Sequence, residues 1–382
     1  MLDLSLTEEQ KQLQKVIADF ARKELNGDLA ARDQKGQFPL DNWRKCASMD
    51  IMALPFPVEL GGCGLDFLST SIAIETLSYA CKDSGLVLAI GTQLISGLLL
   101  NLFGNEEQKR EYIPRLARGE IIAAQAITEA DAGSDAFSML TKAVRSEDQY
   151  IIDGRKMFTT NGSIADIIFV LAVTDPGRKT MGGHSFFVCE KGRTGLSHGN
   201  PFEKMGLRTL QNCELIFDAC SLPSANLIGR EGQGAIIFNE MMEWERILFG
   251  ACHLGSLARI IETCVRYAKE RKQFGQSIGK YQLVANKIAR MKINQELIRP
   301  MIYQTAAQKD SNKRAAMEAS VIKVFASESL KNACLDAVQI HGAYGYMVEY
   351  EIERDLRDSI ASTIYSGTSE MNQLIIAKLL GL

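Results

Sequence analysis

The sequence predicts a mainly α-helical protein with a central β region. Three observations support this class: apolar residues at helical spacing near the start, short β-type runs in the middle, and helical character again after Gly234. This order lacks the alternating strands and helices that a Rossmann fold requires. A chain of 382 residues is long enough for two or three packed units. We therefore expect a helical domain over 1–120, a β domain over 121–230 and a helix bundle over 231–382.

The first region is expected to be helical from its beginning. Thr7 stands three residues before Gln10, the arrangement of a capping box, and apolar residues follow at helical spacing. Asn26 and Gly27 end this helix, and a stretch rich in Pro and Gly over 55–64 separates it from further helices. The charged side chains of the first helix exclude a signal peptide and a transit peptide, so we expect a cytoplasmic protein.

The segment 84–105 carries no charged side chain and is long enough to cross a bilayer, which takes about 20 apolar residues. Glycines and polar side chains interrupt it, among them Gly85, Gly91, Gln93 and Asn101. A basic cluster beside the segment is also missing. These features predict a helix buried within the protein and no membrane partner.

Strand signals begin near residue 121. The run 150–152 is expected to be a strand that ends in a turn at Asp153-Gly154, and 167–173 is expected to be another. Shorter runs lie at 185–188 and 215–217. The helical pattern after Gly234 continues to the end, with breaks expected at Gly275, Gly279 and Pro300. Its length suits a four-helix bundle.

Composition and charge narrow the classes of function. The chain has 43 basic and 46 acidic residues, a net charge of -3, and no Lys/Arg block, so a nucleic-acid partner is not expected. The nine cysteines are dispersed and form no C-x-x-C pair, which predicts neither a disulfide framework nor a zinc site. The four histidines show no metal-ligand spacing, and no metal is expected.

Six short strings fit one family and occur in its order across essentially the whole chain. They lie at 127–135, 154–162, 270–275, 339–343, 354–358 and 364–370. Each string alone is weak; Thr128-Glu129 could be a strand-end turn, Arg271 a solvated charge and Phe158 a core aromatic. Together the six strings resemble the acyl-CoA dehydrogenase family.

The resemblance implies a helical N-terminal domain, a β-barrel-like middle domain, a C-terminal four-helix bundle, an FAD cofactor and a homotetramer. A flavin needs an apolar or aromatic wall, and its diphosphate needs paired donors. The implied FAD residues of one subunit are Ile127, Thr128, Gly133, Ser134, Phe158 and Thr160, with Thr368 and Glu370 at the adenosine part. The residues implied to reach a neighbouring subunit's FAD are Arg271, Gln273, Phe274, Gln282, Gln339, His341, Gly342 and Ala343.

The catalytic base departs from the commonest pattern of the family. Many relatives have Glu immediately before Gly-Thr, where this chain has Ser366. In a branch that includes isovaleryl-type enzymes, the Glu lies on the first bundle helix just before Arg, and Glu245 matches that position. Arg246, Ser366 and Gly367 are then the implied substrate-binding residues, with Ser366 acting only through its backbone N–H. Glu243 is about 200° from Glu245 on a helix, so only one of them should point into a pocket.

The strings 244–246 and 366–368 and the C-terminal end look most like the branch that oxidises prolyl groups on a peptidyl or acyl carrier protein. The implied reaction is flavin-dependent dehydrogenation of a prolyl thioester to a pyrroline or pyrrole thioester in natural-product biosynthesis. A short- or branched-chain acyl-CoA dehydrogenase is the alternative. A non-catalytic helical scaffold is a third, which retention of the FAD strings argues against. Either oxygen or an electron-transfer flavoprotein is expected to accept the electrons.

Overall fold

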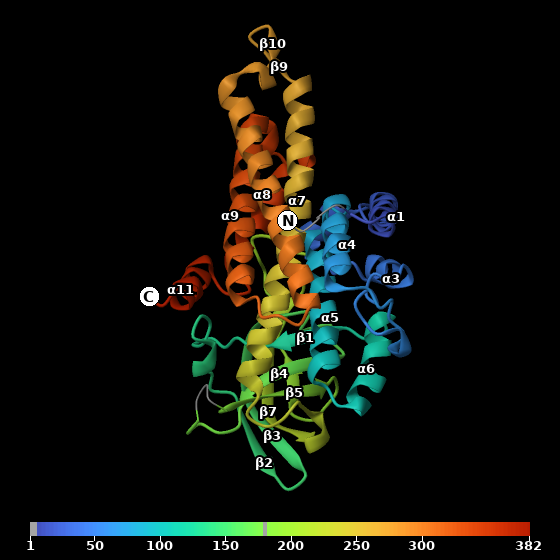
Figure 1. The fold of residues 1–382 in the computed structure, drawn as a ribbon, viewed down its shortest axis with the longest axis vertical. Helices are drawn as coiled ribbons and strands as arrows, with labels where there is room; N and C mark the ends of the chain where they lie inside the picture. The colour runs from blue at the N-terminus through green and yellow to red at the C-terminus, as the bar shows by residue number, and fades with distance from the viewer. Residues whose placement is uncertain (1–5, 179–181) are drawn as a thin grey trace.

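The computed structural model describes residues 6–178 and 182–382 and has three regions in chain order: helices, a β-sheet and long helices (Figure 1). The first region contains α1 (Glu8–Glu24), α2 (Leu29–Lys35), α3 (Leu40–Ser48), α4 (Phe67–Ala80), α5 (Ser84–Phe103) and α6 (Glu106–Ala117). The capping box at the start of α1 is confirmed, because Thr7 and Gln10 each bond the other's backbone N–H. This region is all-helical, as predicted.

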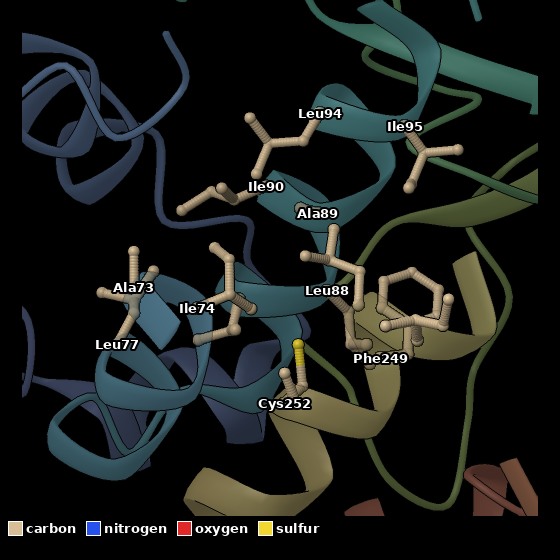
Figure 2. Packing of buried hydrophobic residues seen from close by; sticks show 14 of the residues in the cluster. Ala73, Ile74, Leu77, Leu88, Ala89, Ile90, Leu94, Ile95, Phe249 and Cys252 are labelled. Carbon is tan, nitrogen blue, oxygen red and sulfur yellow. The ribbon is translucent and has the colours of Figure 1, made fainter. Parts of the chain in front are cut away.

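Two helices in the described part of the chain, α5 and α7 (Gly234–Glu270), are long and apolar enough to cross a membrane. In α5, 83% of the most apolar window is buried inside the protein, and in α7 78%. Figure 2 shows part of this packing, where Leu88, Ala89 and Leu94 of α5 lie among apolar residues of α4 and α7. Protein neighbours therefore cover the apolar surface of 84–103, as expected of a core helix.

The sheet contains β1 (Ala123–Ala126), β2 (Lys142–Ser146), β3 (Gln149–Thr160), β4 (Ile167–Val173), β5 (His184–Glu190), β6 (Leu196–His198), β7 (Asn212–Pro223) and β8 (Leu227–Ile228). The order is β6-β7-β3-β2-β4-β5-β8, with β1 parallel to β4. A single parallel pairing, Lys142 of β2 with Val173 of β4, joins the half β6-β7-β3-β2 to the half β4-β5-β8. Their inner faces share one apolar core, in which the rings of Tyr150 and Phe187 lie 4.9 Å apart. In the described residues the strand path from β6 to β8 is open.

The predicted turn at Asp153-Gly154 is wrong. β3 continues through both residues, and its pairing with β7 shifts register between Ile152 and Gly154. Gly154 has φ 151°, and a Cβ there would lie 2.4 Å from Thr141 Oγ1. The glycine therefore permits a β-bulge and close backbone approach, which from sequence alone resembles a turn.

The long helices follow as α7, α8 (Gln282–Asp310) and α9 (Ala316–His341), with the shorter α10 (Ile352–Ala361) and α11 (Ser369–Leu379) at the end. Pro300 lies inside α8, so the predicted break there is wrong. α8 packs against α7 and α9, and buried side chains lie on both sides of the proline, Ile298 before it and Ile302 after it. Gly275 does sit at a joint, in the hairpin of β9 (Lys272–Gln273) and β10 (Gln276–Ser277). Figure 1 shows this hairpin at the end of the bundle remote from the sheet.

Candidate active site

A cavity of about 1490 Å³ lies where the sheet meets the helices. Its walls come from α5, from the ends of β1 and β3, from the segment 202–212, from α7 and from the connection between α10 and α11. Ten of the residues predicted for the site line it: Ile127, Thr128, Gly133, Ser134, Phe158, Thr160, Glu245, Arg246, Ser366 and Gly367. Segments more than 200 residues apart in sequence thus share one space.

Glu245 projects from α7 toward the turn before α11. The hydroxyl of Ser366 donates a hydrogen bond to Glu245 Oε1 at 2.5 Å. Burial raises the pKa of Glu245, while the Ser366 hydroxyl and the Arg246 guanidinium oppose that rise. A raised carboxyl pKa at a cavity wall suits a group that takes up a proton. The Ser366 side chain thus contacts the predicted base, in addition to the expected backbone role.

The Ser366-Gly367 turn has left-handed backbone at both residues, with φ 57° and 83°. Arg246 Nε donates to the Ser366 carbonyl at 3.1 Å, and Asn372 Nδ2 donates to the Gly367 carbonyl at 2.9 Å. Thr368 then caps α11 by accepting from the Met371 N–H at 3.2 Å. Buried Arg246 therefore fixes the Ser366-Gly367 turn, and the turn positions the Ser366 hydroxyl against the Glu245 carboxylate.

Glu243 also contributes to the cavity wall, so the two carboxylates are not on wholly separate surfaces. Their bonding differs. Glu243 Oε2 accepts from Lys309 Nζ at 2.8 Å and from the Ala315 N–H at 2.9 Å. The Glu243 carboxylate is occupied by a structural ion pair, which leaves Glu245 as the better candidate base.

Phe158 presents its ring to the cavity. It has left-handed backbone, φ 56°, and remains 62% exposed. Asn212 Nδ2 holds this backbone by donating to the Phe158 carbonyl at 3.2 Å and to Thr160 Oγ1 at 3.1 Å. The Phe202 ring lies 5.4 Å from that of Phe158. An aromatic ring that is exposed within a cavity is suited to cover a planar ligand.

A buried ion pair fixes the Ile127-Thr128 wall. Lys156 Nζ donates to the Ile127 carbonyl at 2.8 Å and to Glu129 Oε1 at 3.0 Å, and the Met157 N–H donates to the Thr128 carbonyl at 2.7 Å. Burial lowers the pKa of Lys156 to about 8, although Glu129 opposes this. Burial by itself would raise the pKa of Glu129, but Lys156 and backbone donors lower it overall. The Lys156–Glu129 ion pair therefore connects the segment that follows β1 to β3.

The comparisons with known proteins agree with this architecture. The N-terminal, middle and C-terminal domains of acyl-CoA dehydrogenase match residues 7–120, 124–220 and 232–381. An acyl-CoA dehydrogenase of Bacillus subtilis is 39% identical over 377 residues, 99% of each chain. The chain belongs to the acyl-CoA dehydrogenase family.

Two solved structures of this family are also similar. The prolyl acyl carrier protein oxidase AnaB is 43% identical with a TM-score of 0.97, covering 99% of this chain and 100% of that one. PigA, solved with FAD and proline, is 35% identical with a TM-score of 0.97, covering 100% of both chains. As a member of the acyl-CoA dehydrogenase family, the protein is an FAD-dependent oxidoreductase that dehydrogenates acyl thioesters.

The cavity residues fit the flavin. A Cβ added at Gly133 would meet no atom within 4 Å, so a ligand can approach this backbone closely. Ser134 and Thr160 supply hydroxyls, and Phe158 supplies an aromatic face. In the described residues no group of three or more His, Cys, Asp or Glu side chains is arranged to hold a metal ion.

A second group of predicted FAD residues lies outside the cavity wall. Arg271, Gln273 and Phe274 lie on or beside the β9–β10 hairpin, where Phe274 is 95% exposed and Arg271 lies 5.8 Å from the ring centroid of Tyr344. Gln282 begins α8, Gln339 and His341 lie at the end of α9, and Gly342 and Ala343 begin the short 3-10 helix that follows it. Thr368 and Glu370, at the start of α11, are also outside the described cavity lining.

Sequence reasoning assigned no role to several residues that lie at this site. Asn212 and Phe202 lie outside the strings, although they position Phe158. Phe249 lies four residues after Glu245 and also lines the cavity. Residues at this spacing share one face of a helix, so the sequence could have placed Phe249 beside the base. Tyr365 stands inside the string 364–370, next to Ser366, and its ring lines the cavity.

Proposed function

We propose that the protein oxidises a prolyl group carried as a thioester on a carrier protein, with Glu245 as the catalytic base. One observation carries the assignment of the base: Glu245 lies in the cavity wall, has a raised pKa and accepts a hydrogen bond from Ser366. Ser366 stands at the position where many relatives have Glu, so the two walls meet at the place where a base is needed. A thioester makes the adjacent C–H weakly acidic, and a carboxylate of raised pKa is a suitable acceptor for that proton.

The chain's residues have distinct parts in the proposed reaction. Glu245 accepts the proton next to the thioester carbonyl. The backbone N–H of Ser366, for which the described residues provide no acceptor, polarises that carbonyl. Phe158 and the Ile127-Thr128 wall position the flavin, and Arg246 maintains the Ser366 turn. Bound FAD supplies the acceptor for the hydride that leaves the neighbouring carbon.

The identity to the prolyl acyl carrier protein oxidase supports the prolyl substrate. A second candidate, a short- or branched-chain acyl-CoA, is supported by the Bacillus subtilis acyl-CoA dehydrogenase. Both substrates use the same base and the same cofactor, so they differ in the acyl group and in what lies beyond the thioester.

Anaerobic bleaching of the flavin distinguishes these substrates. The purified protein is mixed with prolyl-carrier protein, free proline, isovaleryl-CoA and butyryl-CoA in separate reactions. We expect rapid bleaching by the prolyl-carrier protein only, because free proline lacks the thioester and the CoA esters lack the carrier surface. Rapid bleaching by a simple acyl-CoA, with none by prolyl-carrier protein, would assign the protein to the second candidate.

We also propose a homotetramer in which the hairpin residues Arg271 and Phe274 and the segment 339–343 complete a neighbour's FAD site. Their position outside the described cavity lining supports this arrangement. The electron acceptor is oxygen or an electron-transfer flavoprotein. Hydrogen peroxide formed in air during turnover would identify oxygen.

A further inference from the structure

Lys204 is a half-buried lysine in the wall of the large cavity. Its Nζ donates to Asn212 Oδ1 at 2.5 Å and to the Leu210 carbonyl, and both of these acceptors are neutral groups. Burial lowers the pKa of Lys204 to about 8, although Asp358 opposes this, so the amine is still mainly protonated at pH 7. A protonated lysine carries three donors and no acceptor.

This donor-only contact fixes the orientation of the Asn212 amide. Rotating an Asn amide by about 180° exchanges its oxygen and its NH2 group. With the Lys204 ammonium on one side, the oxygen must face it, because two donors would otherwise meet. The NH2 group therefore faces β3, where Asn212 Nδ2 donates to the Phe158 carbonyl at 3.2 Å and to Thr160 Oγ1 at 3.1 Å.

The end of β3 has a conformation that needs such support. Phe158 has left-handed backbone, φ 56°, which is rare for a bulky aromatic residue. The pairing of β3 with β7 also shifts register here, so that Met157 and Phe158 lie opposite the single residue Glu214. Strained backbone persists only where surrounding contacts determine it. The Asn212 amide is one of these contacts, and it comes from β7, the strand beside β3 (Figure 1).

The same amide sets the direction of the Thr160 hydroxyl. Thr160 lines the cavity, and within the described residues its Oγ1 has one hydrogen-bond partner, Asn212 Nδ2. Because this contact uses the oxygen as an acceptor, the hydroxyl proton remains available to an acceptor in the cavity. A flavin ring carries nitrogen and carbonyl acceptors along its edge.

We propose that Lys204 is a positioning residue of the FAD site, which acts through Asn212 on Phe158 and Thr160. The ammonium group orients the amide. The amide then holds the end of β3 and leaves the Thr160 hydroxyl free to donate to the bound flavin. This inference concerns the cofactor and does not depend on which acyl thioester is the substrate.

Reversing the polarity of the amide tests the proposal. Asn212→Asp keeps the size and offers Lys204 a carboxylate, but it removes the NH2 group, and the Thr160 hydroxyl would then donate to that carboxylate. We expect the visible absorption bands of the bound flavin to shift. On dilution of the holoenzyme, FAD should dissociate about tenfold faster or more, because two acceptors lose their donor. Flavin fluorescence follows this release.

Lys204→Met gives a second, independent change. It removes the donor and leaves the Asn212 amide free to rotate, so both readouts should move in the same direction as in Asn212→Asp, by a smaller factor. Thr160→Val removes the hydroxyl. In that background Asn212→Asp should shift the flavin spectrum less than it does alone, since the two substitutions act on one contact.

Asn226→Asp is the matched control. Asn226 Nδ2 donates to the Val188 carbonyl at 2.7 Å in the same domain, and Asn226 is not part of the described cavity lining. This variant also loses an amide donor to a backbone carbonyl, but it should leave the flavin spectrum and the rate of FAD release unchanged.

The outcomes separate the parts of the proposal. No change of spectrum or FAD release in Asn212→Asp and Lys204→Met would overturn it, and so would equal effects of Asn212→Asp and Asn226→Asp. A change in Asn212→Asp alone would overturn the role of Lys204. These readouts need no substrate, so failure of the prolyl thioester to bleach the flavin would leave this inference standing.

Discussion

Glu245 is half-buried in the cavity wall and accepts a hydrogen bond from Ser366 on the opposite wall. Replacing it with Gln keeps the size and removes the base. Glu245→Gln should therefore lower the rate of flavin reduction by at least the ~10²–10⁴-fold typical of general-base loss, with FAD still bound. Stopped-flow absorbance measures the rate. Glu262→Gln, on the same helix and outside the described cavity lining, is the control. Reduction at nearly the original rate would mean that another carboxylate is the base.

The Ser366 hydroxyl tunes this base. Its hydrogen bond lowers the pKa of Glu245, against the larger raising effect of burial. Ser366→Ala should therefore raise that pKa further, and the fall in kcat/KM on acidification should begin at a higher pH than in wild type. A pH profile of flavin reduction measures this. Ser369→Ala, which removes a nearby buried hydroxyl with no hydrogen-bond partner in the described structure, should leave the profile unmoved. Identical profiles for wild type and Ser366→Ala would refute the tuning.

Single residues also show what the sequence could predict about the site. The strings around Thr128, Phe158 and Ser366 identified residues that do line one cavity, because each string is local and its chemistry is readable. The residues that orient them could not be found this way. Asn212 reaches Phe158 only because β7 pairs with β3, and Arg246 reaches the Ser366 carbonyl only across the packed bundle. Such contacts depend on the tertiary structure.

At the scale of elements, continuous apolar runs were the most informative signals. The strand at 167–173 has the bounds that the sequence predicted, since both of its faces are buried. Glycine and proline were less reliable. Gly154 marks a bulge where a turn was expected, and Pro300 lies within α8 where a break was expected. At Gly154 and at Pro300, packing against neighbouring strands or helices decides the backbone conformation. The local sequence carries no information about those neighbours.

The β-bulge at Gly154 of β3 leads to a prediction about the stability of the protein. A methyl group at Gly154 would lie 2.4 Å from Thr141 Oγ1 and 2.6 Å from its Cα. Gly154→Ala should therefore destabilise the protein by about 1–3 kcal/mol, the usual cost of overpacking. Thermal or denaturant unfolding measures this change. Gly27→Ala is the control, because a Cβ there meets no atom within 4 Å. An unfolding curve like that of wild type would show that β3 can adjust.

At the scale of the whole molecule, the hairpin at the tip of the bundle is the feature that the single chain leaves unexplained. Phe274 is 95% exposed there, although it is a large apolar side chain. If it covers a neighbour's FAD, Phe274→Ala should weaken FAD binding and assembly together, since a ligand bound by the assembled state favours that state. Fluorescence titration and light scattering measure the two effects. Val58→Ala, another exposed apolar position, should change neither. A wild-type monomer with full FAD would contradict the tetramer.

Helix α7 carries both Glu245 and, at its end, the hairpin. From Glu245 to Glu270 the helix rises about 38 Å, so a chain cannot bring its own hairpin to its own base. Two defective chains could therefore rescue each other. A Glu245→Gln chain retains an intact hairpin, and a Phe274→Ala chain retains an intact base. When unfolded together and reassembled, the mixture should regain activity that neither parent has. A lasting absence of such complementation would mean that each chain builds its site alone.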